Sequence, residues 1–348
     1  MSLVPTLVDT VVGSPLRVAD VLVEGSLQTA DAVVGGSLCA AGVCADHDPR
    51  HLEPAYTDEH SKYVDVGGTS VHYRDEGTGP TLLLLHGTFS SLHTWDDWTE
   101  ELTEEYRVVR VDLPGHGLTG PHPEFSYHMD GFTAFVEAFC RAVDIDDFTV
   151  VGNSRGGGIA WRYALDYDRA QRLVLIDAMG FPMTPPTPLM RLLAIPGFRT
   201  AFRWLTPEWF IAEAVHEVYG DAERIAPGTV ERYHDLLLHQ GNRAAVLDIL
   251  RRDLDPDHRY DELPDLEVPT LVMWGELDPW LPPEWATRFR DVIPDAEVVT
   301  YDDVGHAPME EVPAKSVADL RAFLDDWRPP VAITVEDPTD PDRLRSDS

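Results

Sequence analysis

The sequence Phe148-Thr-Val-Val-Gly-Asn-Ser-Arg-Gly-Gly-Gly-Ile-Ala-Trp161 carries the clearest structural signal in this chain. Its apolar and β-branched beginning predicts a buried strand, and the residues from Arg155 onward predict a helix. Between them lies a Gly-x-Ser-x-Gly turn, whose small residues allow a sharp change of direction. Such a turn exposes the hydroxyl of Ser154 at the positive end of a helix, as a nucleophile requires.

A serine hydroxyl is a poor nucleophile at neutral pH unless a base lies within hydrogen-bond reach and a carboxylate orients that base. Two loops that follow later predicted strands supply these groups: one carries Asp278 and the next carries His306. We therefore predict Ser154 as nucleophile, His306 as general base and Asp278 as the orienting acid. Asp177, which also follows a predicted strand, is the alternative acid.

Strands and helices alternate along most of the chain, which predicts an α/β fold with a mostly parallel central sheet covered by helices. Strands are expected at 81–85, 107–111, 148–151, 173–176, 270–274 and 297–301, and helices near 127–143, 155–167, 283–292 and 313–327. Some ninety residues between 176 and 270 show helical periodicity without a strand signal, so they predict an inserted helical lid. We divide the chain into an amphipathic extension at 1–50, a core at 51–180 and 263–328, a lid at 181–262, and an acidic, disordered tail at 329–348.

Residues 62 to 328 resemble an α/β-hydrolase with a helical cap. The resemblance is carried, in the family's order, by His86-Gly87-Thr88-Phe89, Asp112-Leu-Pro-Gly-His-Gly117, Gly152-Asn-Ser-Arg-Gly156 and the Asp278/His306 pair. It implies an oxyanion hole formed by the backbone N–H groups of Arg155 and Thr88, with Phe89 as the alternative second donor. It assigns no cofactor.

The serine nucleophile disfavours the haloalkane dehalogenases and epoxide hydrolases of this fold, which attack with a carboxylate. Hydrolysis of a carboxylic ester or thioester remains, as does carbon–carbon bond cleavage of the meta-cleavage product type. The loop His86-Gly-Thr-Phe-Ser-Ser departs from the glycine-rich form typical of the second group, so ester hydrolysis is favoured. A third hypothesis is a ligand-binding member of the fold with negligible turnover.

Aromatic residues of the lid and its surroundings predict a small to medium apolar substrate. The residues predicted to contact it are Phe89, Trp204, Trp209 and Trp280. The alternative is that the lid aromatics form the lid's own core. Arg155 either binds a substrate carboxylate or pairs with a lid acid.

The composition is strongly acidic, with 61 acidic against 27 basic side chains and a net charge of −34, and only Lys62 and Lys315 are lysines. Nucleic acid is disfavoured as a partner because its phosphates would be repelled. Concentrated salt screens such self-repulsion, which predicts a halophile's protein. The sequence has no apolar run long enough to span a bilayer, no signal peptide, and no cysteine spacing for a disulfide framework or metal site. We therefore expect a cytoplasmic protein without a bound metal.

An 11-residue repeat occupies the first forty residues, where Asp9, Asp20 and Asp31 recur in step with apolar positions. Eleven residues make about three helical turns, so the apolar positions share one face of a helix. This helix could pack on the catalytic domain, form a homo-oligomer or contact a membrane peripherally. Its own negative charge provides no attraction to anionic lipid.

Overall fold

The computed structural model describes residues 46–182, 187–193, 195–253 and 259–325. The predicted 11-residue repeat at 1–45 and the predicted tail at 329–348 lie outside these residues. Within them, no helix is both long and apolar enough to cross a membrane.

An eight-stranded sheet forms the centre of the molecule, in the order β1-β2-β4-β3-β5-β6-β7-β8. The strands are β1 Ser61–Val66, β2 Thr69–Glu76, β3 Thr81–Leu85, β4 Arg107–Val111, β5 Phe148–Asn153, β6 Ala170–Ile176, β7 Thr270–Gly275 and β8 Glu297–Tyr301. Strand β2 pairs antiparallel with both β1 and β4, and all other pairs from β4 to β8 are parallel. The predicted fold class is confirmed, although the hairpin of β1 and β2 was not among the predicted strands.

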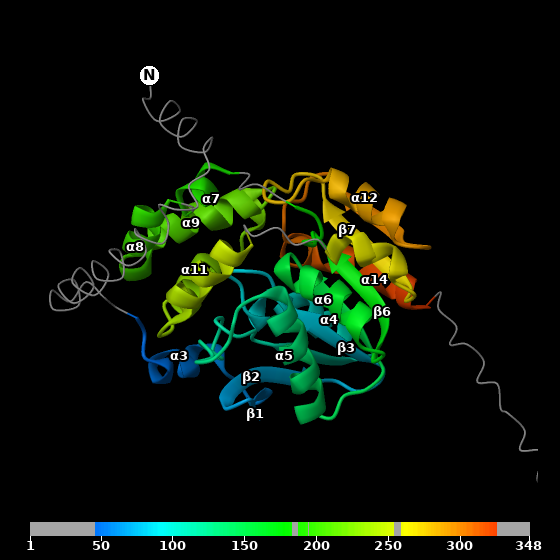
Figure 1. Ribbon diagram of the computed structural model, residues 1–348, viewed down its shortest axis with the longest axis horizontal. Coiled ribbons are helices and arrows are strands. Elements are labelled where there is room, and N and C mark those ends of the chain that lie inside the picture. The colour runs from blue at the N-terminus through cyan, green and yellow to red at the C-terminus, as the bar shows by residue number, and fades with distance from the viewer. Residues whose placement is uncertain (1–45, 183–186, 194, 254–258, 326–348) are drawn as a thin grey trace, which may run out of the picture.

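Helices cover both faces of this sheet (Figure 1). They are α4 Asp96–Leu102, α5 Met129–Ala142, α6 Arg155–Asp166, α12 Glu284–Val292 and α14 Pro313–Asp325, with the short helices α3 Pro49–Tyr56 and α13 Pro308–Glu311 beside them. Alternate residues of β3 show the two layers. Leu83 belongs to the apolar cluster that α5, α6 and α12 complete, and Leu84 belongs to the one that α4 and α14 complete. All five residues of this strand except Thr81 are buried, as expected for a central parallel strand.

The chain between β6 and β7 forms the helices α7 Pro188–Leu193, α8 Pro196–Trp204, α9 Glu208–Val218, α10 Thr229–Leu237 and α11 Asn242–Arg252. Figure 1 shows α7, α8, α9 and α11 gathered apart from the helices that cover the sheet. They have an apolar core of their own, which includes Phe202, Phe210, Tyr219 and Val246. This inserted helical unit is called the lid below.

Candidate active site

Ser154 lies at the sharp turn between β5 and α6. Its φ angle is +55°, and it is the N-cap residue of α6. The turn needs glycine on both sides: a Cβ atom at Gly152 would lie 2.2 Å from the carbonyl oxygen of Gly156, and one at Gly156 would lie 2.1 Å from that of Leu85. Substitution would therefore force the backbone apart, which explains why the sequence motif predicts this conformation. The strained backbone leaves the serine side chain at the wall of a cavity.

His306 and Asp278 follow β8 and β7, and the structure brings both to the edge of the sheet where Ser154 lies. The Nδ1 atom of His306 is 2.7 Å from Oδ2 of Asp278. Oδ1 of Asp278 accepts hydrogen bonds from the backbone N–H groups of Trp280 and Leu281, at 2.8 and 3.0 Å. The carboxylate is thus held on one side by its own loop and presents the other side to the imidazole.

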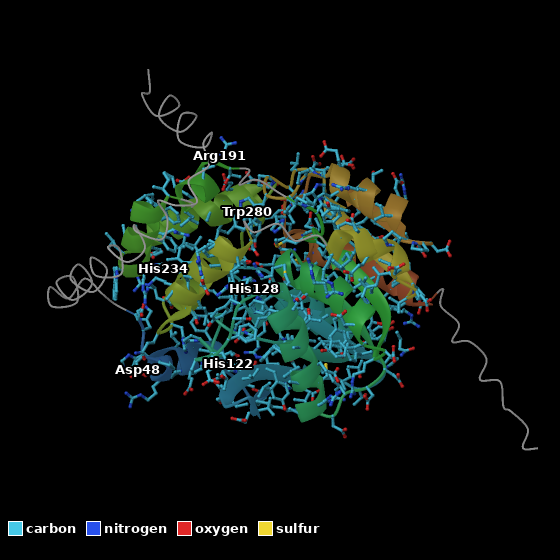
Figure 2. The ribbon with its side chains drawn as sticks, viewed as in Figure 1. Asp48, His122, His128, Arg191, His234 and Trp280 are labelled. Carbon is cyan, nitrogen blue, oxygen red and sulfur yellow. The ribbon has the colours of Figure 1, made fainter. Side chains whose placement is uncertain are left out.

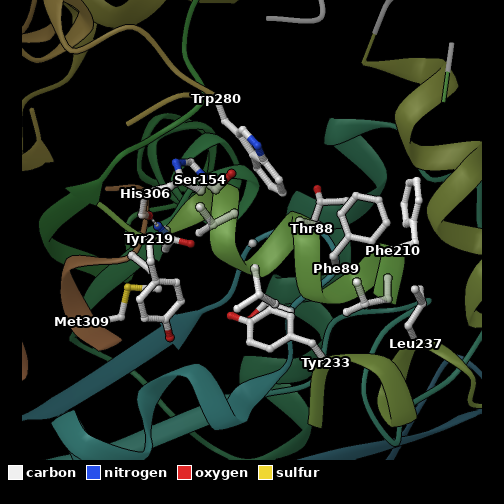
Figure 3. Close-up of a pocket in the computed structure, with 18 of the residues that line it drawn as sticks. Thr88, Phe89, Ser154, Phe210, Tyr219, Tyr233, Leu237, Trp280, His306 and Met309 are labelled. Atoms are coloured by element: carbon white, nitrogen blue, oxygen red, sulfur yellow. Dashed lines mark hydrogen bonds between the residues drawn. The ribbon is translucent and has the colours of Figure 1, made fainter. Parts of the chain in front are cut away.

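The second ring nitrogen of His306, Nε2, is buried and has no hydrogen-bond partner among the described residues. Ser154 and His306 line the same cavity and lie side by side there (Figure 3). The structure therefore brings the three predicted residues together, and Nε2 of the cavity-lining His306 is left unpaired among the described residues. An unpaired buried nitrogen costs stability, and such a group calls for a functional explanation.

The loop predicted to form the oxyanion hole lies beside Ser154. Gly87, Thr88 and Phe89 line the cavity, and Phe89 has a φ angle of +66°. The side chain of His86 holds this loop through two hydrogen bonds. Its Nδ1 donates to the carbonyl oxygen of Gly87 at 2.8 Å, and its Nε2 accepts from the backbone N–H of Leu113 at 3.0 Å. Burial lowers the pKa of His86, which favours the neutral ring that can make both bonds.

Three backbone N–H groups could stabilise an oxyanion at this point. No acceptor for the N–H of Thr88, Phe89 or Arg155 is found in the part of the chain that the structure describes. Arg155 begins α6, where the first N–H groups of a helix lack partners within the helix. Both predicted choices for the second donor, Thr88 and Phe89, therefore stay open.

The Arg155 side chain resolves an alternative that the sequence left open. It is fully buried and forms an ion pair with Asp253, the residue that follows helix α11 of the lid. Its Nε also donates to Oγ1 of Thr88 at 3.1 Å, and its guanidinium lies over the ring of Phe132 at 5.4 Å. The cation thus pairs with a lid acid and is not among the groups that line the cavity.

The cavity and the open solvent space at its mouth together measure about 760 Å³, and the lining is apolar. Lid side chains that line it include Leu193, Phe210, Ile211, Val215 and Leu237. Phe89 and Trp280, two of the residues predicted to contact substrate, line it from the core side. Trp280 lies between the lid and the core (Figure 2), where its ring is 5.4 Å from that of His306 and its Nε1 donates to Glu217 of α9 at 3.3 Å.

The structure corrects the prediction for Trp204 and Trp209, because neither lines the cavity. Trp209 is 66% exposed. In helix α9, Phe210 and Ile211 face the cavity. Trp209 precedes Phe210, lies about 100° from it around the helix, and faces outward. In α8, Phe202 enters the lid core, and Trp204 lies about 200° further around.

Sequence reasoning missed Glu310, which follows the cavity-lining residue Met309 and bonds to two further residues of the cavity wall, Tyr219 and Tyr233. Its two carboxylate oxygens accept hydrogen bonds from Tyr219 at 2.6 Å, Tyr233 at 2.7 Å and Arg232 at 2.8 Å, all residues of the lid. Burial and the Glu310 charge raise the pKa of both tyrosines, so their hydroxyls remain protonated donors. No local pattern in the sequence indicated that one glutamate would hold three lid side chains.

Asp177, the alternative acid, does not contact the histidine in the way that Asp278 does. It follows β6, and its Oδ1 accepts from the backbone N–H of Gly275 at 3.0 Å. Oxygen atoms of Asp177 and Asp278 and a ring nitrogen of His306 lie within 4.8 Å of one another, the only such group of potential metal-binding side chains among the described residues. Within this group His306 is hydrogen-bonded to Asp278 at 2.7 Å, which fits a proton-transfer site better than a cation site.

Comparisons with known proteins agree with this architecture. Residues 80–313 match the model of the alpha/beta hydrolase fold family. The chain is similar to Lipase 3 of Moraxella sp. (strain TA144), with 27% identity over 72% of this chain and 79% of that protein. It is also similar to the 2-hydroxy-6-oxo-2,4-heptadienoate hydrolase of Pseudomonas putida, with 24% identity over 71% and 90% of the two chains.

Among solved structures, the chain is similar to a membrane phospholipase A described as a bacterial virulence factor. The TM-score is 0.66 and the sequence identity is 26%, and the match covers 89% of this chain and 96% of that one. The matched family model spans most of the chain and includes all three residues of the Ser154, Asp278 and His306 group. The chain therefore belongs to the α/β-hydrolase fold family.

Proposed function

We propose that this chain is a serine hydrolase that cleaves a carboxylic ester or thioester of a small to medium apolar substrate. The observation that carries the proposal is the position of Ser154 and the unpaired Nε2 of His306 on the wall of one apolar cavity. Asp278 supports it, because a carboxylate bonded to Nδ1 selects the tautomer whose Nε2 can accept a proton.

The proposed reaction has two steps. Ser154 Oγ attacks the carbonyl carbon while its proton passes to Nε2 of His306, and the oxyanion is stabilised by the N–H of Arg155 and that of Thr88 or Phe89. His306 then protonates the departing alcohol or thiol, leaving an acyl-enzyme. A water molecule, deprotonated by the same imidazole, attacks the acyl carbon and releases the acid.

The lining of the cavity supports a neutral, apolar acyl group. Among the described residues, no Asp, Glu, Lys or Arg side chain lines it, and His306 is its one lining histidine. The nearby cation, Arg155, is engaged by Asp253. The name of the Pseudomonas relative specifies a dienoate, which carries a carboxylate. In this cavity such a carboxylate would lose its hydration without gaining a cationic partner. This favours ester hydrolysis over carbon–carbon cleavage of an anionic substrate.

A chain-length series of p-nitrophenyl esters, from acetate to dodecanoate, tests the proposal in multimolar KCl. We expect saturable turnover of the wild type with a preference for apolar acyl chains, and no turnover of Ser154→Ala. A meta-cleavage dienoate serves as the rival substrate. If the folded wild type cleaved the dienoate and left every ester intact, the carbon–carbon hydrolase would replace the esterase; if it cleaved neither, the ligand-binding hypothesis would take precedence.

The extension at 1–45 lies outside the described residues. Its packing on this domain, its role in a homo-oligomer and its contact with a membrane stay predictions, as do the cytoplasmic location and the halophilic character.

A further inference from the structure

A second aspartate, Asp177, lies close to Asp278 of the proposed triad. Asp177 follows β6 and Asp278 follows β7, and because these strands are parallel neighbours their carboxyl ends lie at the same edge of the sheet. Asp177 is fully buried. Its Oδ1 accepts one hydrogen bond, from the N–H of Gly275 at 3.0 Å, whereas its Oδ2 is buried and has no donor among the described residues.

Among the described residues, the groups found to act on Asp177 include no arginine or lysine. They are Asp278 after β7, His306 after β8, Tyr301 within β8 and Glu311 of α13. Glu311 is occupied with the backbone N–H groups of Gly305 and Gly220. Two ionised carboxylates this close in a buried site would repel each other strongly.

One proton between the two carboxyl groups removes this conflict. Burial, followed by the negative charge of Asp278, raises the pKa of Asp177 well above its usual value. A protonated Asp177 also gives its unpaired Oδ2 a use, since an O–H group donates where a carboxylate can only accept.

We propose that Asp177 is a positioning residue that stays protonated and donates a hydrogen bond to Asp278, which fixes the Asp278 carboxylate behind His306. This inference rests on the proposed function, because it assigns Asp177 a role through the triad. Asp278 would then accept four hydrogen bonds: from Trp280, Leu281, His306 and Asp177. The imidazolium formed during the reaction would face one negative charge instead of two.

Two substitutions separate this role from a general packing role. Asp177→Asn keeps the shape of a protonated aspartic acid: its Oδ1 can accept from Gly275 and its Nδ2 can donate to Asp278. Asp177→Leu is also neutral and of similar size, but it donates nothing. If Asp177 were ionised in the wild type, both substitutions would remove a negative charge near the histidine.

The pH dependence of kcat/KM for a p-nitrophenyl ester gives the kinetic test. We expect the acid limb of Asp177→Asn to coincide with that of the wild type, because no charge changes. In Asp177→Leu, loss of the donor leaves more negative charge on Asp278, so protonation of the imidazole becomes easier and the acid limb moves to higher pH. A shift of the Asp177→Asn limb to lower pH by about one unit or more would contradict the proposal, since it would reveal a lost negative charge.

A second readout does not depend on catalysis. Infrared difference spectroscopy of wild type against Asp177→Asn at neutral pH should show the carbonyl stretch of one protonated carboxylic acid that the variant lacks. Absence of this band would overturn the proposal even with normal turnover. If the wild type had no esterase activity, the proposed function would fail, and the infrared band alone would decide whether Asp177 is protonated. The infrared band would also decide this question if Asp177→Leu did not fold.

Discussion

The described residues include two sets of one serine, one histidine and one aspartate, one around Ser154 and the other on or beside the strands β1, β2 and β4. Around Ser154, His306 bonds to Asp278. In the second set, Nδ1 of His72 lies 2.8 Å from Oδ2 of Asp112, and its Nε2 lies 3.2 Å from Oγ of Ser61.

The two aspartates even have the same kinds of partner. Asp112 accepts from the backbone N–H groups of Leu92 and Leu118 as well as from His72. By hydrogen bonding alone, the Ser61 set is the more complete of the two, because its serine and histidine are already in contact while Nε2 of His306 has no partner among the described residues.

The surroundings of the two serines differ in every respect that makes a nucleophile. Ser61 begins an ordinary edge strand, its hydroxyl accepts from the N–H of Asp58 and from Nε of Arg74, and it does not line the cavity. Ser154 has a positive φ angle, is the N-cap residue of a helix and lines the cavity. Residue types in contact are therefore insufficient; backbone strain, the helix N-terminus and space for a substrate distinguish the reactive set.

Removing each serine gives the largest expected contrast. Ser154→Ala should lower kcat for ester hydrolysis by roughly 10⁴-fold or more, because only binding and oxyanion stabilisation remain. Ser61→Ala should leave kcat within about twofold, because Ser61 touches neither the cavity nor the triad. Steady-state kinetics on one ester, with circular dichroism to verify folding, checks both. A large loss of kcat in folded Ser61→Ala would break the comparison.

Removing each aspartate should separate activity from stability. Asp278→Asn should lower kcat by about 10²- to 10⁴-fold through the wrong imidazole tautomer, with a small change in the free energy of unfolding. Asp112→Ala should instead cost on the order of 3 kcal/mol of that free energy, because His72 and two buried N–H groups lose their acceptor. Urea unfolding and kcat, measured on both variants, report the two effects; the reverse assignment would contradict the account.

Glu310 should have a moderate effect, confined to substrate binding. Glu310→Gln weakens the hydrogen bonds that hold Tyr219, Tyr233 and Arg232 of the lid, so we expect KM to rise about threefold to tenfold with kcat nearly unchanged. Asp319→Asn is the matched control. Asp319 accepts a hydrogen bond from Tyr301 at 2.9 Å, and neither of these residues lines the cavity. Equal changes in KM for both variants would remove the special role of Glu310.

The smallest effect concerns pH. Burial alone would raise the pKa of Asp112, but hydrogen bonds from His72 and from backbone N–H groups lower it below the usual value of 3.8. A depressed pKa in the folded state stabilises the fold fully above 3.8, and this contribution is lost as the pH falls below it. The difference in unfolding free energy between wild type and Asp112→Asn should therefore shrink from pH 5 to pH 3. Urea unfolding measures this difference in free energy. A difference that stayed constant from pH 5 to pH 3 would refute the lowered pKa of Asp112.

Local signals explain what the sequence could predict. The Gly152 to Gly156 turn requires its conformation sterically, and buried parallel strands such as β3 and β5 are continuous apolar runs, so the core and the positions of Ser154, Asp278 and His306 followed from them. The β1–β2 hairpin was not predicted because β1 mixes apolar residues with charged ones such as Lys62 and Asp65.

Other features depend on contacts between distant segments. Which face of α8 or α9 turns inward decides the exposure of Trp204 and Trp209, and periodicity within a short helix does not say which neighbour covers it. Asp253 lies 98 residues from Arg155, and Asp177 lies 101 residues from Asp278. Such pairs arise only when the sheet and the lid are assembled, so their roles could be listed as alternatives but not chosen.

Covalent labelling of the full chain with a fluorophosphonate, followed by mass spectrometry of its peptides, tests the central claim most directly. We predict one adduct, on the peptide that contains Ser154, none on the peptide that contains Ser61, and no labelling of folded Ser154→Ala or His306→Ala. An adduct on Ser61, or a folded and soluble wild type without any adduct on Ser154, would contradict the assignment of Ser154 as the activated nucleophile.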